Sequence, residues 1–223
     1  MLPGVVMAAL AAAGCPAISN VQTADTLGKQ AFQIGLETTA QRVASPYLPY
    51  YGFANMSMRY GLTDTTDVGV RLGNAGVEAS AKFLLTEPGA RELAVSLLPA
   101  VGGGVFHTSR WVEIAESSVT LLAGIPLRRD ELVGGIRLGG RAMLGPRHDG
   151  ELEAGISLGY SLRVSERFGV FSELAIALPL VESSGSSENL GTPSPHAPNA
   201  SSLQNLVIAQ FTVALAFGRQ RRR

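Results

Sequence analysis

The sequence is poor in cysteine, histidine and charge. Its single cysteine excludes an internal disulfide framework and a multi-cysteine metal site. Its three histidines show no H-x-x-x-H spacing, so we expect neither a metal nor a cofactor. The chain has 18 Lys and Arg residues and 18 Asp and Glu residues. These equal numbers exclude the overall positive charge by which a protein attracts nucleic acid.

Long apolar runs are also missing beyond the N-terminus, although the mean hydropathy is +0.20. Because a membrane-spanning helix needs about 20 consecutive apolar residues, the sequence excludes a bundle of such helices. Charged residues make up only 16% of the chain, well below the usual quarter of a soluble domain. Apolar residues spread over many alternating segments produce this combination. It is not the composition of an ordinary cytosolic enzyme.

The N-terminal segment has the features of an export signal. Residues 1–17 are apolar and end in small residues, and the stretch 5–13 has signal-peptide length. The residues AAGC ending at Cys15 resemble the processing box of bacterial lipoproteins, with Ala12 where that box usually has Leu. This resemblance implies acylation of Cys15, and a plain signal peptide cut near Ala17 is the alternative. The rest, 18–223, is expected to be one domain.

Period-two alternation dominates the remaining chain. The clearest stretch places Leu, Ala, Ile, Leu, Tyr, Leu and Val on one face of 152–164, with Glu, Gly, Ser and Arg on the other. The stretches 68–72, 77–85, 132–144 and 207–217 repeat the pattern. We expect about ten strands, at 30–39, 51–61, 65–73, 76–86, 91–101, 113–125, 131–144, 150–164, 168–181 and 203–217. Their lengths suit an all-β, antiparallel up-and-down transmembrane β-barrel, with eight or twelve strands as alternatives.

Loop lengths agree with this count. The connections 62–64, 87–90, 126–130 and 165–167 are short, and the alternate ones include the Ser/Pro/Asn-rich segment 182–202. If the chain starts in the periplasm, the short turns lie there and the long loops lie outside. An even strand number also returns the C-terminus to the periplasm. Sequence therefore predicts a barrel of the cell outer membrane.

Two short stretches resemble small uncharacterised outer-membrane β-barrel proteins of Gram-negative bacteria. VQTADTLGKQAFQIG, at 21–35, resembles their post-cysteine opening, with Gln30 in place of an expected glycine. YGLTDTTDVGVRLGNAGVEASAKFLL, at 60–85, resembles their second and third hairpins. The last strand resembles the assembly signal of such barrels, closing on Phe217 with six residues after it. The resemblance implies location in the outer membrane, contact with its lipids and with the barrel-assembly machinery, and no specific activity.

If the apolar faces meet lipid, the charged faces point into the barrel. The expected lumen-facing charged residues are Glu37, Arg59, Arg71, Glu78, Lys82, Glu116, Arg137, Arg141, Glu153, Arg163 and Glu173. Because unpaired buried charge is costly and small barrels are filled by side chains, we expect an ion-paired plug. A narrow polar pore, or a small-ligand site at Arg137 and Arg141, is the alternative.

Other features carry weaker hypotheses. His107, beside Thr108 and Ser109, and His148, beside Asp149, are the candidates for a loop-borne hydrolase or acyltransferase, but such neighbours arise by chance in loops. Gly102–Gly104 lacks the Lys-Ser/Thr of a phosphate loop and indicates a bulge or bend in a strand. Aromatic residues at loop–strand junctions are expected to form a girdle, or a sugar-binding platform: Tyr47, Tyr50, Tyr51, Phe53, Phe106 and Trp111.

The sequence thus predicts a non-enzymatic barrel with a structural role, or with passive transport of small solutes or lipids. A soluble, secreted or periplasmic lipocalin-like barrel is the second hypothesis. The phase of burial separates the two, because Ile156, Leu158 and Tyr160 point outward and Arg137 inward only in a membrane barrel. The arginines of 219–223 are expected to be solvated, with contact to anionic headgroups as the alternative.

Overall fold

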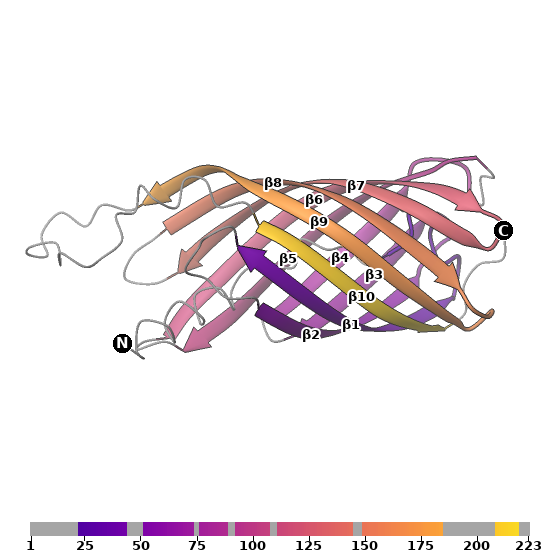
Figure 1. Ribbon diagram of the computed structural model, residues 1–223, viewed down its shortest axis with the longest axis horizontal. Helices are drawn as coiled ribbons and strands as arrows, with labels where there is room; N and C mark the ends of the chain where they lie inside the picture. Colours follow the sequence, from indigo (N-terminus) through magenta and orange to yellow (C-terminus); the bar gives the residue numbers. More distant parts are fainter. Residues whose placement is uncertain are drawn as a thin grey trace, which may run out of the picture.

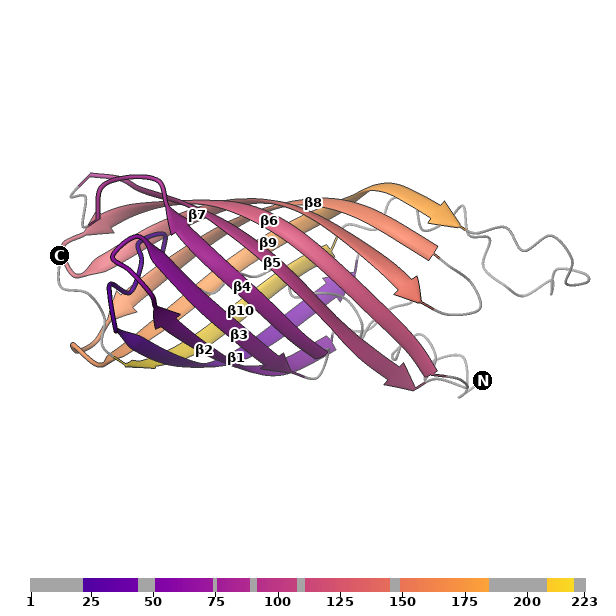
Figure 2. The same cartoon turned by 180° about the vertical axis from the view of Figure 1, so that it is seen from behind.

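A computed structural model describes residues 22–43, 51–73, 76–88, 92–107, 111–144, 149–184 and 208–218. These form a closed barrel of ten antiparallel strands (Figures 1 and 2). The strands are β1 Phe32–Val43, β2 Tyr51–Gly61, β3 Thr66–Gly73, β4 Gly76–Leu84, β5 Ala94–His107, β6 Trp111–Leu127, β7 Asp130–Leu144, β8 Asp149–Arg163, β9 Phe168–Ser184 and β10 Ile208–Gly218. Within these ranges no segment forms a helix with the length and apolarity needed to span a bilayer.

Each strand pairs with its neighbours in sequence, and β1 pairs with β10 to close the barrel. The predicted up-and-down fold and the count of ten are therefore confirmed. The connections β2–β3, β4–β5, β6–β7 and β8–β9 share one end of the barrel with the end of β10; we name it the turn end, on the right in Figure 1. The opposite end is the loop end.

Strand boundaries differ from the expected ones mainly at the loop end. β5 continues to His107 and β6 starts at Trp111, so His107 belongs to a strand and not to a loop. β9 runs on to Ser184, and β10 begins only at Ile208. Hydrogen bonding across these hairpins extends the ladder past the region where apolar alternation marks the strand.

The alternation in sequence becomes two surfaces. Ile156 on β8 is 63% exposed and pairs with outward-facing Ile136 on β7, whereas Arg137, one residue later, is only 5% exposed. Leu158 and Tyr160 are likewise outward. This is the phase expected of a membrane barrel. It contradicts the soluble lipocalin-like hypothesis, which requires apolar residues inside.

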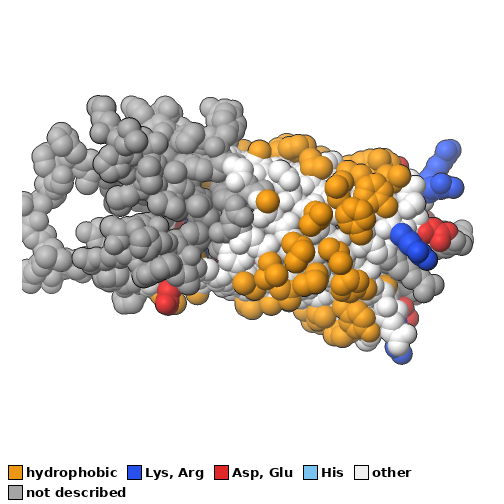
Figure 3. Space-filling view, turned by 90° about the horizontal axis from the view of Figure 1, so that it is seen from below, with side chains coloured by type: hydrophobic (Ala, Val, Ile, Leu, Met, Phe, Trp, Pro, Cys, Tyr) orange, Lys and Arg blue, Asp and Glu red, His pale blue; other side chains and the backbone are white. Residues whose placement is uncertain are grey.

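The outer surface is apolar up to a charged rim at the turn end. Figure 3 shows apolar side chains spread over the wall, with the basic and acidic ones gathered at that end. On β8 the outward apolar residues run from Leu152 to Leu162, which at ordinary strand rise and tilt spans about 25 Å of barrel height. That matches the apolar band of an outer-membrane barrel.

Aromatic residues ring the wall close to the turn end. Phe168 and Phe217 stack with their ring centroids 5.2 Å apart. Exposed aromatic rings lie on five strands around the same end: Phe32, Tyr60, Phe83, Tyr160 and Phe217. Aromatic girdles of this kind lie at membrane–water boundaries. The side chains from which a girdle was expected, those of Tyr47, Tyr50, Tyr51, Phe53, Phe106 and Trp111, lie outside the described residues.

Gly102–Gly104 do not form the expected bulge. β5 stays in register with both β4 and β6 through these glycines. A Cβ at Gly103 would lie 2.8 Å from the carbonyl oxygen of Ile114, so the glycine permits a close approach of two strands. The register shift in the described sheet falls instead between Leu152 and Glu153, where β8 faces Val181 and Pro179 of β9.

Candidate functional site

Residues 22–27, which precede the first strand, lie inside the barrel at its turn end. Ala24 is fully buried, and its neighbours are buried or half-buried, including the polar side chains of Asp25 and Thr26. We name this segment the N-terminal plug. The sequence assigned this segment to the domain 18–223 but did not predict that it enters the lumen, because the segment carries no alternation that would mark its surroundings.

Three charged side chains of the wall hold the main chain of the N-terminal plug. Asp67 on β3 accepts hydrogen bonds from the backbone N–H of Leu27, with both carboxylate oxygens 3.1 Å from that nitrogen. Glu131 on β7 accepts from the backbone N–H of Ala24 at 2.8 Å. The third is Lys82 on β4, which donates to the carbonyl oxygens of Thr23, at 3.0 Å, and Asp25.

The same wall residues neutralise one another. Lys82 Nζ lies 3.4 Å from the Asp67 carboxylate, which also pairs with the Arg59 guanidinium. Lys82 and Asp67 have side chains only 1% exposed, so both charges are fully removed from water. Buried charges of this kind are tolerated when they are paired and hydrogen-bonded. The N-terminal plug supplies some of these hydrogen bonds, so it stabilises the buried charges of the wall while they hold it in place.

An apolar cluster surrounds Ala24. Its buried members come from the inward faces of β4 to β7, β9 and β10: Leu84, Ala94, Leu98, Leu122, Val133, Phe171 and Ala214. Gly124 has no side chain and so leaves space for the methyl group of Ala24. A Cβ added there would lie 2.8 Å from the Cβ of Ala24 and 2.1 Å from Glu131 Oε1. The site therefore accommodates a small apolar side chain.

A tight turn connects the N-terminal plug to β1. Gly28 has φ 87°. Its carbonyl oxygen lies 1.9 Å from the position that a Cβ on residue 61 would take, so Gly61 leaves room for this oxygen. Gln30 has φ 60°, in the left-handed region that favours glycine. Its backbone N–H donates to the Gly61 carbonyl at 2.8 Å. A glycine, which the resemblance leads one to expect at position 30, would adopt this conformation without strain.

The N-terminal plug leaves very little empty space at the turn end. A cavity of about 30 Å³ lies between Gln22, Thr23 and the inner faces of β1, β2, β8, β9 and β10. Another, of about 20 Å³, lies between Thr23, Arg163 and the β6–β7 turn. Each has room for one or two water molecules. Neither of these two cavities beside the N-terminal plug has room for a larger solute.

Further along the lumen, Arg71 on β3 is the centre of an acidic layer. Its Nε lies 3.2 Å from Glu37 Oε2 on β1, and its Nη1 lies 3.5 Å from Glu78 Oε1 on β4. Glu173 on β9 and Glu116 on β6 also interact electrostatically with Arg71. A single guanidinium thus faces carboxylates from four other strands and ties opposite walls of the barrel together.

A second set of ion pairs lines the wall of β7 and β8. Arg137 Nε lies 3.9 Å from Glu153 Oε1, and Arg141 bridges Glu153, at 4.0 Å, and Glu151, at 3.5 Å. Towards the loop end of β1 and β10 the lining is uncharged, with a hydrogen bond of 2.9 Å between the hydroxyls of Thr39 and Thr212. The interior is therefore largely polar along the described wall, with a larger apolar cluster at the turn end and a small one of Ala175, Ala177 and Ile208 towards the loop end.

All eleven residues expected to face the lumen lie on the inward faces of their strands, and none is more than partly exposed. Arg163 is the outermost, beside the cavity at the β6–β7 turn. Asp67, Glu131 and Glu151 are the charged wall residues that were not on that list. The alternation places Asp67 on the same strand face as Arg71, so the sequence alone was sufficient to predict that Asp67 faces the lumen.

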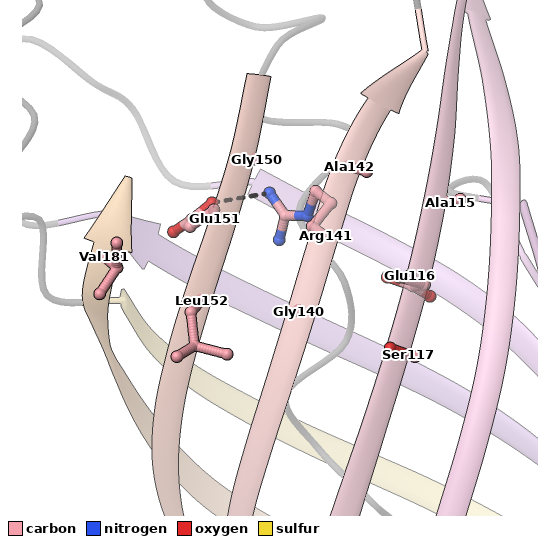
Figure 4. Close-up of a pocket in the computed structure, with 10 residues that line it drawn as sticks. All are labelled: Ala115, Glu116, Ser117, Gly140, Arg141, Ala142, Gly150, Glu151, Leu152 and Val181. Carbon is pink, nitrogen blue, oxygen red and sulfur yellow. Dashed lines mark ion pairs between the residues drawn. The ribbon is translucent and has the colours of Figure 1, made fainter. Parts of the chain in front are cut away.

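A shallow open depression of about 480 Å³ lies near the loop end of β6 to β9 (Figure 4). Ala115, Ser117, Ala142 and Leu152 are its exposed outward residues, and the Arg141–Glu151 ion pair lies beside it. Its outer wall is formed of small residues, which makes it a hollow in the apolar surface.

Several hypotheses fall outside the described residues. These are acylation of Cys15, the role of the His148 loop, and the side chain of His107. Among the residues that the structure does describe, no group of three or more His, Cys, Asp or Glu side chains converges as metal ligands do.

An apolar wall around a charged interior defines the class of the protein. Closure of the sheet leaves no unpaired strand edge, which is the condition for a β-structure to lie in a bilayer. The apolar band, the aromatic ring at the turn end and the charged rim beyond it complete the pattern. The chain is therefore an outer-membrane β-barrel.

Comparisons with known proteins add only the fold. No family model matches the chain, and no curated protein matches it. Among solved structures it is similar to the outer membrane protease OmpT of Escherichia coli, at 8% identity and a TM-score of 0.42 over 91% of this chain and 100% of that one. It is also similar to the translocator domain of autotransporter NalP of Neisseria meningitidis, at 10% identity and 0.44 over 85% and 89%. Likenesses this loose carry no argument about function.

Proposed function

We propose that this protein is a closed outer-membrane barrel with a structural role, and that its N-terminal plug seals the periplasmic end. The observation that carries the proposal is the packing around Thr23, which lines two cavities of only about 30 and 20 Å³. A hydrated ion or a small solute needs a continuous water-filled path, and spaces of one or two waters do not supply it. The ion-paired layer around Arg71 narrows the lumen further.

The orientation of the barrel in the outer membrane follows from the difference between its turn end and its loop end. Short turns and both described chain ends lie at the turn end, and short turns face the periplasm in barrels of this class. The N-terminal plug therefore closes the periplasmic mouth. Export by the signal at 1–17 and assembly through the last strand, ending at Phe217, fit this orientation and belong to the same proposal.

Passive transport of small solutes or lipids is the second candidate. The polar lining between Thr39, Thr212 and the ion pairs of β7 and β8 favours it, because such a lining would solvate a polar solute. It requires displacement of the N-terminal plug.

Planar-bilayer recording of the refolded protein tests the proposal. We expect a silent bilayer, with insertion verified by heat-modifiable gel migration and by resistance of the membrane-bound protein to carbonate extraction. Steady single-channel steps from the wild-type protein would contradict a closed barrel. Release of the protein by carbonate would contradict its place in the membrane.

A further inference from the structure

The contacts that hold the N-terminal plug are unusual in their chemistry. Asp67, Glu131 and Lys82 bind its backbone N–H and C=O groups, and not its side chains. These are groups that any short peptide carries. Among its side chains, Ala24 fills the apolar cluster and the Thr26 hydroxyl donates to the Asp64 carbonyl at 2.6 Å.

The binding groups belong to the barrel and not to the plug. Asp67, Lys82 and Glu131 project from three different strands, each paired on both sides into the closed sheet. Residues 22–27 contribute no strand pairing to that sheet. The receptor is therefore built by residues that remain in place when the segment is absent.

Charge favours occupation of the mouth. Without the segment, Lys82 loses two carbonyl acceptors, and Asp67 and Glu131 each lose a backbone donor. Leaving buried charged groups without such partners costs free energy. Without the N-terminal plug, the turn end of the barrel thus presents an ammonium donor and two carboxylate acceptors that the N–H and C=O groups of a peptide can satisfy.

We propose that the periplasmic mouth is a peptide-binding site, occupied in the resting protein by its own residues 22–27. When that segment is withdrawn, the site takes a short peptide with a small apolar side chain at the position of Ala24. The inference rests on the proposed function, in which the same segment closes the mouth. It adds the ligand class, a short peptide from the periplasmic side.

The test uses a barrel whose own segment no longer fits. Ala24→Leu in the full chain enlarges the side chain that fills the apolar cluster, without altering Asp67, Lys82 or Glu131. A variant lacking residues 22–27 is the second form, because every strand pairing lies outside that segment. Heat-modifiable migration shows which of the two has folded.

The probe is a fluorescent synthetic peptide of residues 22–27, and the readout is fluorescence anisotropy. We expect saturable binding to either opened barrel and much weaker binding to the wild type, whose own segment competes. A probe carrying Ala24→Leu, and an opened barrel carrying Lys82→Met, should each bind about 10- to 100-fold more weakly, because leucine overfills the site and methionine removes hydrogen bonds to a charge.

Gly124→Ala in the opened barrel is a further variant within the site. Its Cβ would lie 2.8 Å from the Cβ of Ala24, so it should also weaken binding of the probe, about 10- to 100-fold. A folded, opened barrel that does not bind the probe, or binds both probes equally, overturns the inference. Because binding is measured without conductance, this failure is distinct from a wild-type barrel that conducts, which overturns the proposed function.

Discussion

The Lys82 ammonium and the Asp67 carboxylate lie 3.4 Å apart inside the barrel, each with 1% of its side chain exposed. They come from adjacent strands, β4 and β3, and face each other directly in the register. Both also bind the main chain of the N-terminal plug, Lys82 at Thr23 and Asp67 at Leu27. One buried ion pair therefore joins the wall to the segment that closes it.

Lys82→Met should weaken this junction. It leaves the carbonyl oxygens of Thr23 and Asp25 without their donor, and Asp67 with Arg59 as its remaining cation. We expect the free energy of unfolding to fall by about 3 kcal/mol, the lower end for a broken buried pair. Urea unfolding of the refolded barrel measures it, and hydrogen exchange at Ala24 and Leu27 should quicken.

The matched control is Lys29→Met, the same change at an exposed lysine beside the turn into β1. It should alter the free energy of unfolding by no more than about 0.5 kcal/mol. Equal effects of the two substitutions would show that the Lys82 contact with the N-terminal plug contributes nothing to stability.

Ile156→Arg tests the apolar wall. Ile156 lies near the middle of β8 and is 63% exposed on the outer face. A cation there meets the hydrocarbon centre, so we expect a loss of about 2–4 kcal/mol in unfolding measured in lipid vesicles. Val164→Arg, just past the end of β8, should cost only about 0–1 kcal/mol. If both positions tolerate arginine equally, the wall is not in a bilayer.

Gln30→Gly should stabilise the turn that leads from the N-terminal plug into β1. A left-handed φ of 60° costs a residue with a Cβ about 1–2 kcal/mol, and glycine avoids this at an entropic cost of about 0.5–1 kcal/mol. We expect a net gain of about 0.5 kcal/mol in equilibrium unfolding. Gln33→Gly, within β1, should instead destabilise the barrel by about 0.5–1 kcal/mol. A loss at both positions would contradict the strain at Gln30.

Acylation of Cys15 stays a prediction from the processing box. Metabolic labelling with a clickable fatty acid should tag the wild-type protein and leave Cys15→Ser untagged. Both forms should reach the outer membrane if export needs only the signal at 1–17. A mature N-terminus at residue 18, found by N-terminal sequencing, would replace acylation with cleavage of a plain signal peptide.

Sequence determined the fold and the two surfaces of this protein. Period-two alternation requires each strand to present one face to each environment, so Ile156 and Arg137 had to lie on opposite sides of the wall. The number of alternating segments and the lengths of their connections then predicted an up-and-down barrel of about ten strands, with eight or twelve as alternatives. These properties are local, because they depend on residues one or two positions apart.

Only the tertiary structure decided what fills the lumen. Residues 22–27 have no periodic pattern, and their hydrogen-bond partners at Asp67, Lys82 and Glu131 lie 40 to 107 positions along the chain. Such partners meet only after the sheet has curved and closed, because closure brings the inward faces of β3, β4 and β7 around one axis. Alternation showed which charges face inward, and closure decided which of them pair and which hold the N-terminal plug.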